Sequence, residues 1–289
     1  MKTIYLFALS LVVSLAAFAQ EKGNAYNLDK EYAMAANGTL ILKCSDAKVS
    51  ISGTTRTNAH VKINRLVTTK GWVFGNHDEF SVDVTEEGGN LELEERKHHQ
   101  MSGVIGHYSE KYTIDISVPQ GASLRVKGDD GDYKINNIDG EISIEADDAD
   151  VALTACSGSR FRFRLDDGDI TMDEGMGDLT IDADDADVRI SNAKFSSINA
   201  DMDDGDLIVE TALFDNGDYR IRSQDGLVAL TVTQGGGKFE IRHDDTRVIT
   251  EGNFQKLEES EDRTRLALAS GNANVEIRTD DARVRLVKR

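Results

Sequence analysis

The chain has 289 residues, a formal net charge of −19 and a single proline, and only 6% of its residues are aromatic. A surface this acidic repels the phosphates of nucleic acids and the headgroups of anionic membranes, so the composition argues against both as partners. The 25 glycines are typical of short strands joined by tight turns, and no Pro-rich or Ser-rich linker divides the chain.

Residues 1–19 have the pattern of a secretory signal peptide. Lys2 precedes an apolar run over residues 4–17, and Ala17 and Ala19 are the small residues that a signal peptidase requires. The run is shorter than the roughly 20 residues that a membrane-spanning helix needs. We therefore expect an exported protein, periplasmic or at the cell surface, that does not span the membrane after cleavage, with residues 20–37 as a flexible leader.

One twelve-residue phrase recurs along the chain and defines its organisation. Its close copies start 18 to 21 residues apart, at Leu124, Ile142, Phe161, Leu179, Ile198 and Tyr219. Looser copies start at Leu40, Phe239 and Val275. A short fixed period is typical of stacked repeats, in which each unit buries its apolar face against its neighbours.

The alternation within each copy predicts two strands. Places 1, 3 and 5 of the phrase are apolar or small, and so are places 10 and 12, which gives each half one buried face. We expect an all-β fold, a single-stranded β-helix or β-solenoid with rungs of about 18 to 19 residues. The alternative is an antiparallel meander of hairpins, because Asp-Gly between alternating strands is a hairpin signal. Ala149 and Ala186 disfavour the meander, since alanine resists the positive φ that such turns need.

Between these strands lies an acidic turn, DDGD in one copy and DDAD in the next. Its second Asp, at place 7, occurs in all nine copies, and we expect it to accept hydrogen bonds from backbone N–H groups and to fix the corner. Places 6 and 9 of five central copies carry further carboxylates: Asp129, Asp132, Asp147, Asp150, Asp166, Asp169, Asp184, Asp187, Asp203 and Asp206. Stacked carboxylates repel one another unless cations intervene, and calcium prefers such oxygen ligands. A hydrated acidic ridge explains the pattern without an ion, so calcium remains a candidate and no cofactor is predicted.

Outward place 4 alternates in charge through Lys127, Glu145, Arg164 and Asp182. In a stack each of these charges would meet an opposite neighbour, which favours rungs stacked in chain order.

Residues 38–122 are expected to form an N-terminal β cap together with the first rung. Alternation predicts strands over residues 60–67, 80–85, 91–95 and 112–118. Two longer loops separate them, and apolar loop tips are typical docking sites. The candidate partner residues in these loops are Trp72, Phe74, His98, His99, Met101 and Ile105. The simpler interpretation is that the two loops pack on each other and close the end of the stack.

The histidines of these loops suggest zinc but do not have its spacing. His98, His99 and His107 lie in the second loop and His77 in the first, and no zinc motif contains adjacent histidines in this arrangement. We predict no zinc site. Cys44 and Cys156 both occupy inward places far apart in the stack, so we expect two buried free thiols.

Residues 123–250 would then form the solenoid core, and residues 251–289 the C-terminal rung and cap. The charged segment over residues 251–265 is expected to leave the stack and cap its last rung. The final strand carries four basic residues, which would discourage pairing at a sheet edge.

A signal peptide followed by rungs of this form resembles the bacterial adhesin-like β-strand-repeat family of unknown function, and is similar to the head domains of related autotransporter adhesins. The resemblance covers most of residues 38–289. It implies a β-helix-like fold at the cell envelope and brings no catalytic residues.

Three functions fit these observations. The first is a non-enzymatic binding or scaffold protein that contacts an envelope protein or glycan. The second is a calcium-dependent polysaccharide lyase or another carbohydrate-active β-helix, with Arg162 or Arg164 as the base, although such short turns leave little wall for a substrate cleft. The third is a structural envelope spacer. We expect the first, without enzymatic activity.

Overall fold

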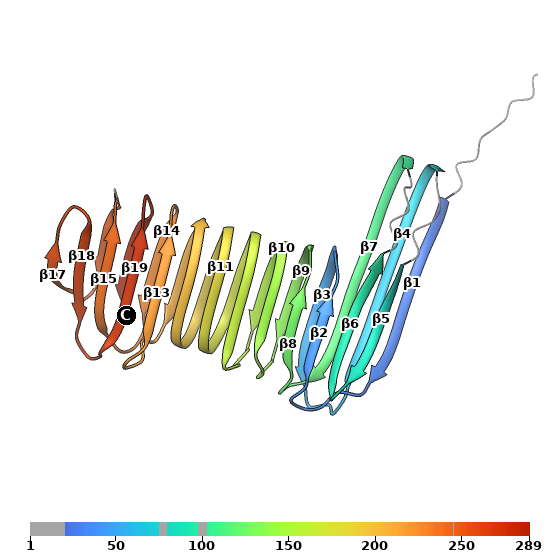
Figure 1. Cartoon of the computed structure of the whole chain (residues 1–289), viewed down its shortest axis with the longest axis horizontal. Helices are drawn as coiled ribbons and strands as arrows, with labels where there is room; N and C mark the ends of the chain where they lie inside the picture. The colour runs from blue at the N-terminus through green and yellow to red at the C-terminus, as the bar shows by residue number, and fades with distance from the viewer. Residues whose placement is uncertain (1–20, 75–79, 98–102, 245) are drawn as a thin grey trace, which may run out of the picture.

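The computed structural model describes residues 21–74, 80–97, 103–244 and 246–289, and the expected signal peptide lies outside these ranges. Within them the all-β prediction is confirmed, because every regular element is a strand and the 20 strands join one sheet. None of the described segments forms a helix long and apolar enough to cross a membrane. The strands lie side by side along the long axis of the molecule (Figure 1).

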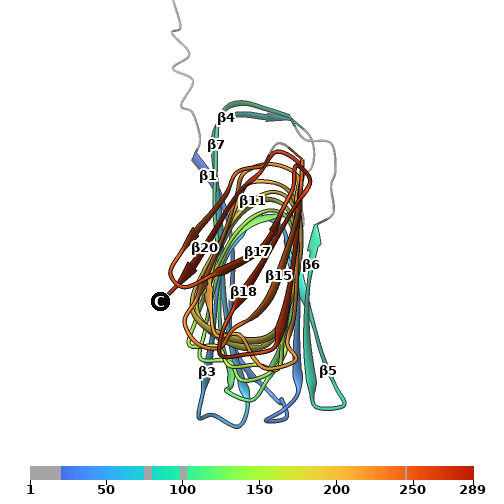
Figure 2. The ribbon, with the colours of Figure 1, turned by 90° about the vertical axis from the view of Figure 1, so that its left-hand side faces the viewer.

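The close copies of the phrase form the central stack. Its strands are β8 (Ser123–Lys127), β9 (Asp130–Asn136), β10 (Ile142–Thr154), β11 (Arg160–Asp204), β12 (Asp206–Thr211), β13 (Asp218–Ser223) and β14 (Leu227–Val232). Equivalent places pair in parallel, so that Ile142 faces Leu124 on one side and Phe161 on the other. Seen along the axis, the chain coils round a flattened core (Figure 2). Successive copies in this region are therefore stacked, and the meander alternative is wrong for them.

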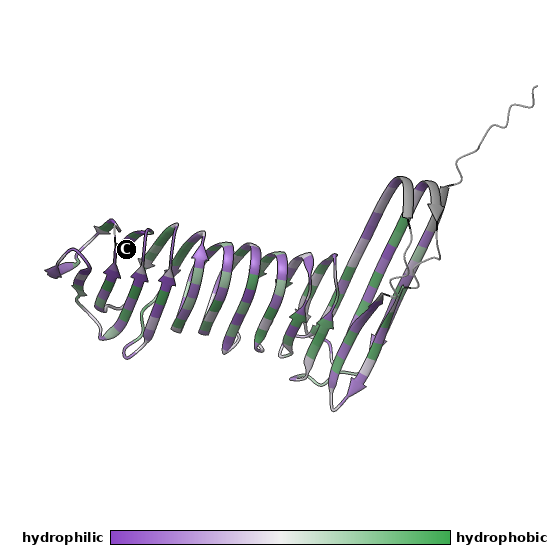
Figure 3. Cartoon of the chain, turned by 45° about the horizontal axis from the view of Figure 1, so that its top comes forward, coloured by the Kyte–Doolittle hydropathy of each residue, from purple (hydrophilic) through white to green (hydrophobic). Residues whose placement is uncertain are grey.

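The alternation of the sequence explains the core of the stack. Along each strand, hydrophobic and hydrophilic residues alternate (Figure 3). Phe161, Phe163 and Met172 are fully buried inside the coil. β11 runs through more than two rungs without a break, although several of its corner residues, such as Gly168 and Asn192, have positive φ. Place 8 points inward at each corner, where only a small side chain such as Ala149 fits.

At the N-terminal end the stack does not follow chain order. The strands here are β1 (Glu21–Tyr32), β2 (Thr39–Lys43), β3 (Ala47–Thr54), β4 (Ala59–Phe74), β5 (Phe80–Glu87), β6 (Asn90–Lys97) and β7 (Gly103–Pro119). The first copy, β2 and β3, pairs with β8 and β9 on one side and with β6 and β7 on the other. The chain therefore leaves the first copy, builds the outer strands and returns past the first copy to begin the central stack. The four strands predicted in this region correspond to β4, β5, β6 and β7.

The segment expected to be a flexible leader contains a strand. β1 pairs antiparallel with β4 over its whole length, from Glu21 opposite Lys70 to Tyr32 opposite Ala59. Tyr26 packs edge-on against Phe80, with ring centroids 5.0 Å apart. The expectation of a leader without structure over residues 20–37 is thus wrong for β1, because β4 offers a free edge that a twelve-residue strand can pair with.

The C-terminal end repeats the same arrangement. Its strands are β15 (Gly237–His243), β16 (Val248–Glu251), β17 (Gln255–Glu259), β18 (Arg263–Leu268), β19 (Ala273–Thr279) and β20 (Arg283–Lys288). The last copy, β19 and β20, lies between β13 and β14 on one side and β15 and β16 on the other. The prediction that the basic final strand forms a sheet edge is therefore wrong. The outermost strand is instead β17, which is exposed along its length and pairs only with β18 among the described strands.

Both cysteines are buried and unlinked, as expected. Cys44 Sγ lies 3.9 Å from the hydroxyl oxygen of Tyr133. The Cys156 thiol donates weakly to the carbonyl oxygen of Thr154, and burial raises its pKa. The two residues act as small core side chains.

Candidate functional sites: an acidic corner and a basic groove

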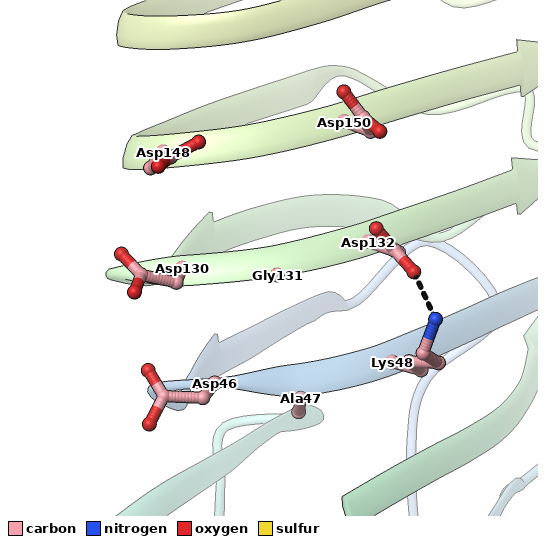
Figure 4. Close-up of a pocket in the computed structure, with 8 residues that line it drawn as sticks. All are labelled: Asp46, Ala47, Lys48, Asp130, Gly131, Asp132, Asp148 and Asp150. Atoms are coloured by element: carbon pink, nitrogen blue, oxygen red, sulfur yellow. Dashed lines mark hydrogen bonds and ion pairs between the residues drawn. The ribbon is translucent and has the colours of Figure 1, made fainter.

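The stacked acidic turns line one edge of the molecule. At its N-terminal end a hollow of about 330 Å³ is lined mainly by acidic side chains of three neighbouring rungs. Figure 4 shows Asp46, Asp130 and Asp148 in one column and Asp132 and Asp150 in a second. The structure thus brings equivalent aspartates of successive copies together, as the repeat predicted.

An internal lysine ends the second column. Because β3 pairs with β9, Lys48 lies beside Asp132, and its Nζ is 2.6 Å from Asp132 Oδ2. This contact raises the pKa of Lys48. Both side chains are exposed, so solvent screens the pair and it contributes little to stability.

Place 9 has a structural role in every second rung. Asp150 Oδ1 accepts a hydrogen bond from the backbone N–H of Asp169 at 3.2 Å, and Asp187 Oδ1 accepts one from Asp206 at 2.9 Å. In both cases the donor follows a glycine at positive φ, Gly168 at 110° and Gly205 at 107°. That conformation turns the next N–H away from the sheet ladder, and the aspartate of the neighbouring DDAD rung accepts it. For the corners at Gly168 and Gly205, this pairing explains why a DDGD rung follows a DDAD rung.

In three of the central copies, place 7 does not have the role predicted for it. The side chains of Asp130, Asp148 and Asp167 are exposed and form no hydrogen bond with any of the described residues. The corner is held by place 9 instead, because the place 7 side chain points outward from the bend. The pKa of Asp130 is raised, first by partial desolvation and then by the neighbouring carboxylates of Asp46 and Asp148.

Two aspartates of one turn show the electrostatics of this edge. Partial desolvation, followed by repulsion from Asp166 and Asp203, raises the pKa of Asp184. The backbone N–H of Asp206, followed by Arg189, lowers the pKa of Asp187. Arg189 Nη2 lies 2.8 Å from Asp187 Oδ2. Among the described residues no group of three or more His, Cys, Asp or Glu side chains is placed to hold a metal ion.

The candidate partner loops are shorter than expected. β4 and β7 continue outward as an antiparallel pair, in which Trp72 lies opposite Ile105 and Phe74 opposite Gly103. The expected contact between the two segments is therefore made by strand pairing at these positions. His98, His99 and Met101 lie outside the described residues.

A second site lies on the outward face of five neighbouring rungs. β2, β8, β10 and the first two rungs of β11 line a groove of about 740 Å³. Six of its lining residues are basic: Lys43, Arg125, Lys127, Arg160, Arg162 and Arg164. The sequence predicted only part of this cluster. Lys43 belongs to it because β2 of the first copy pairs with β8, and this pairing is between segments far apart in the chain.

Part of the groove follows the predicted alternation of charge. Lys127 Nζ lies 2.9 Å from Glu145 Oε1, and Arg164 Nε lies 3.8 Å from Asp182 Oδ2. The hydrogen bond from Lys127 lowers the pKa of Glu145, and Arg164 lowers it further. The predicted neutralisation along place 4 is confirmed for these two pairs.

Place 2 of the groove is different, and its two cations are Arg125 and Arg162. Arg125 and Arg162 are both exposed, and neither has an ion-pair or hydrogen-bond partner among the described residues. Ser143 pairs with both and lies between them. Comparing place 2 from copy to copy in the sequence predicts that these arginines lie two rungs apart. The sequence does not show whether they have ion-pair partners.

Comparison with known proteins places this architecture in a family. The family model described as Toastrack DUF4097 matches residues 39–286. A Bacteroides fragilis protein of known structure, described as "a putative adhesin", is similar with a TM-score of 0.52 and 10% identity over 90% of this chain and 97% of that one. A Clostridium sporogenes structure, described as "a putative cell adhesion protein", aligns with a TM-score of 0.27 and 13% identity over 93% of this chain and 100% of that one. Comparison with curated proteins gives no match. The family model covers the chain from β2 into β20, well over half of its length, and the chain therefore belongs to the Toastrack DUF4097 family.

Proposed function

We propose that this chain is an exported β-solenoid of the cell envelope that acts as a non-enzymatic, adhesin-like binding scaffold. The basic groove is the observation that carries the proposal. It presents outward side chains from five rungs on a regular parallel sheet, and such a sheet holds its side chains at fixed spacing.

Two further observations support a binding role. A Bacteroides fragilis protein with a similar fold is described as "a putative adhesin". The surface in question also carries unneutralised charge, which in a pure spacer would only lower stability. The expected signal peptide supports the location, because an exported scaffold meets envelope proteins and glycans.

The proposal is tested by adherence. Purified protein carrying a fluorescent label is mixed with intact bacterial cells and with isolated envelope material, and the bound fraction is measured against concentration. We expect saturable binding that is lost when Arg125→Glu and Arg162→Glu are combined. The matched control combines Lys134→Glu and Lys194→Glu, which changes the net charge equally at exposed positions outside the groove.

Two results would contradict the proposal. Equal adherence of the groove variant and the control variant would leave only a spacer role. A rise in ultraviolet absorbance during incubation with uronate polymers would reveal unsaturated sugar products, and thus the lyase activity of the alternative reading.

A further inference from the structure

The basic groove stands out against the charge of the molecule around it. Residues 123–217 contain eight lysines and arginines, and five of them line the groove. The rest of this segment is dominated by aspartate and glutamate, which also fill the acidic corner. A ligand bound here must be anionic to match the basic side chains of the groove. It must also stay within the groove, because a large polyanion that wraps the stack would be repelled by the acidic edge.

The two free arginines set the geometry of such a ligand. Arg125 and Arg162 occupy the same place on rungs two steps apart, with Ser143 between them. Two rung spacings are about 10 Å. This distance is comparable to one disaccharide of an extended polysaccharide. A guanidinium group binds a carboxylate through two parallel N–H···O hydrogen bonds, so each arginine is suited to one carboxylate.

The floor between the arginines suits a sugar chain. Ser143 is short and carries a hydroxyl, and Ile41 offers an apolar surface beside Arg125. The paired cations Lys127 and Arg164 border the same face with their carboxylate partners, which can accept hydrogen bonds from sugar hydroxyls. A flat strip of alternating long and short side chains can hold a linear polymer that runs along the solenoid axis, across the strands.

We propose that the groove binds a linear, carboxylated polysaccharide with one uronate per disaccharide, held by Arg125 and Arg162. This inference rests on the binding role proposed above and adds the chemical class of the ligand. Lys43 and Arg160 also line the groove, but each is ion-paired, Lys43 with Glu92 at 2.7 Å and Arg160 with Glu141 at 3.6 Å, so the charge offered to a ligand comes mainly from Arg125 and Arg162. The binding step involves no covalent chemistry, so its energy comes from charge-assisted hydrogen bonds in a partly screened site.

The test uses the full chain and hyaluronan oligosaccharides, which carry one carboxylate per disaccharide. Binding is measured by calorimetry or by fluorescence anisotropy at low salt, and the carboxyl-reduced oligosaccharide is the neutral probe. We expect binding of hyaluronan, weaker binding as salt rises, and no binding of the reduced form. Combining Arg125→Ala and Arg162→Ala should lower the affinity about tenfold or more. Combining Lys134→Ala and Lys194→Ala removes the same charge outside the groove and should leave the affinity within about twofold.

Several outcomes would overturn the ligand assignment. These are equal affinity of the two double variants, equal binding of the reduced oligosaccharide, and tighter binding of polyphosphate than of hyaluronan. Arg162→Lys should retain part of the affinity, which separates loss of charge from loss of the groove. If cells still adhere through Arg125 and Arg162 while hyaluronan does not bind, the binding function stands and the ligand class is wrong. If neither binds, both proposals fail.

Discussion

The central stack and the two ends of this molecule are built from the same twelve-residue phrase, but their copies differ in which strands they pair with. In the centre, each copy pairs with the copies before and after it in the chain, as Ile142 does with Leu124 and Phe161. At the ends, the first and last copies are each inserted between strands that come from distant parts of the chain. The phrase therefore specifies the shape of a rung, and the segments between copies decide which rungs become neighbours. Both ends finish in antiparallel strands, which close a stack of parallel rungs that could otherwise continue to grow.

Deleting residues 270–289 should have the largest effect, because it removes an inner rung. β19 and β20 bury Val275, Ile277, Val284 and Leu286, and each such side chain contributes about 1.5 to 3 kcal/mol. We expect β15 to β18 to unfold and hydrogen exchange to rise in β13 and β14 as well. If β15 keeps its protection in an exchange experiment, the last copy is a terminal rung and the insertion is wrong.

Introducing one aspartate should destabilise the protein strongly in the central stack and hardly at all on the outermost strand. Ile181 is 1% exposed, and Ile181→Asp should lower the free energy of unfolding by about 3 to 5 kcal/mol because an unpaired carboxylate is buried. Leu257 on β17 is 54% exposed, and Leu257→Asp should change stability by less than about 0.5 kcal/mol. Urea denaturation measures both. Similar midpoints for the two variants would refute the inward assignment of Ile181.

The two corner types should respond differently to the exchange of glycine and alanine. At Gly205 the backbone φ is 107°, and an added Cβ would lie 2.3 Å from the carbonyl oxygen of Ala186. Gly205→Ala should therefore cost about 1 to 3 kcal/mol. Ala186→Gly leaves the corner without strain and should cost about 0.5 to 1 kcal/mol, mostly through backbone entropy. Thermal unfolding of the two variants compares the corners directly, and equal losses would mean that the rungs have one corner type.

Asp184 and Asp187 should affect stability with opposite signs. The folded pKa of Asp187 is lowered, so its ionised form stabilises the fold at neutral pH, and this contribution disappears as the pH falls through the lowered pKa. The folded pKa of Asp184 is raised, so its ionisation destabilises the fold at neutral pH, and this loss disappears in acid. Asp187→Ala should lower the melting temperature at neutral pH, and Asp184→Asn should raise it slightly. The Asp184 difference should shrink above the ordinary pKa of a carboxyl group, as the pH falls through the raised pKa, and the Asp187 difference should shrink only below that ordinary pKa; a pH series of melting curves tests this.

Calcium should have the smallest effect. We expect calcium to change the melting temperature no more than magnesium does at equal ionic strength, because the described carboxylates form no cluster of three or more metal ligands. A specific site filled at a hundred times its dissociation constant would add about 2.7 kcal/mol of stability. A rise of several degrees with calcium alone would therefore turn the aspartate columns into a metal site.

The predicted functional residues had mixed outcomes. The carboxylate columns lie where the repeat placed them, because parallel stacking aligns equivalent places of successive copies. The corner role was predicted for place 7 and belongs to place 9, since which aspartate meets a free N–H depends on the positive φ of Gly168 and Gly205 in the neighbouring rung. The basic groove was missed as a unit. Its components were visible at places 2 and 4, but Lys43 joins it only through the return of the chain past the first copy.

The sequence alone determined the all-β class, the length of a rung and the inward or outward direction of each side chain in the central copies, because the period-two alternation of strands is a local property. Tertiary structure alone decided that β1 is a strand, that the first and last copies lie inside the stack, and that Arg125 and Arg162 have no ion-pair partner within the described part of the chain. These features depend on pairing between segments far apart in the chain. An edge strand can pair with any strand that has a suitable alternation of apolar and polar residues. The repeat therefore determines how two rungs pair, and the order of the rungs at the two ends depends on contacts across the whole fold.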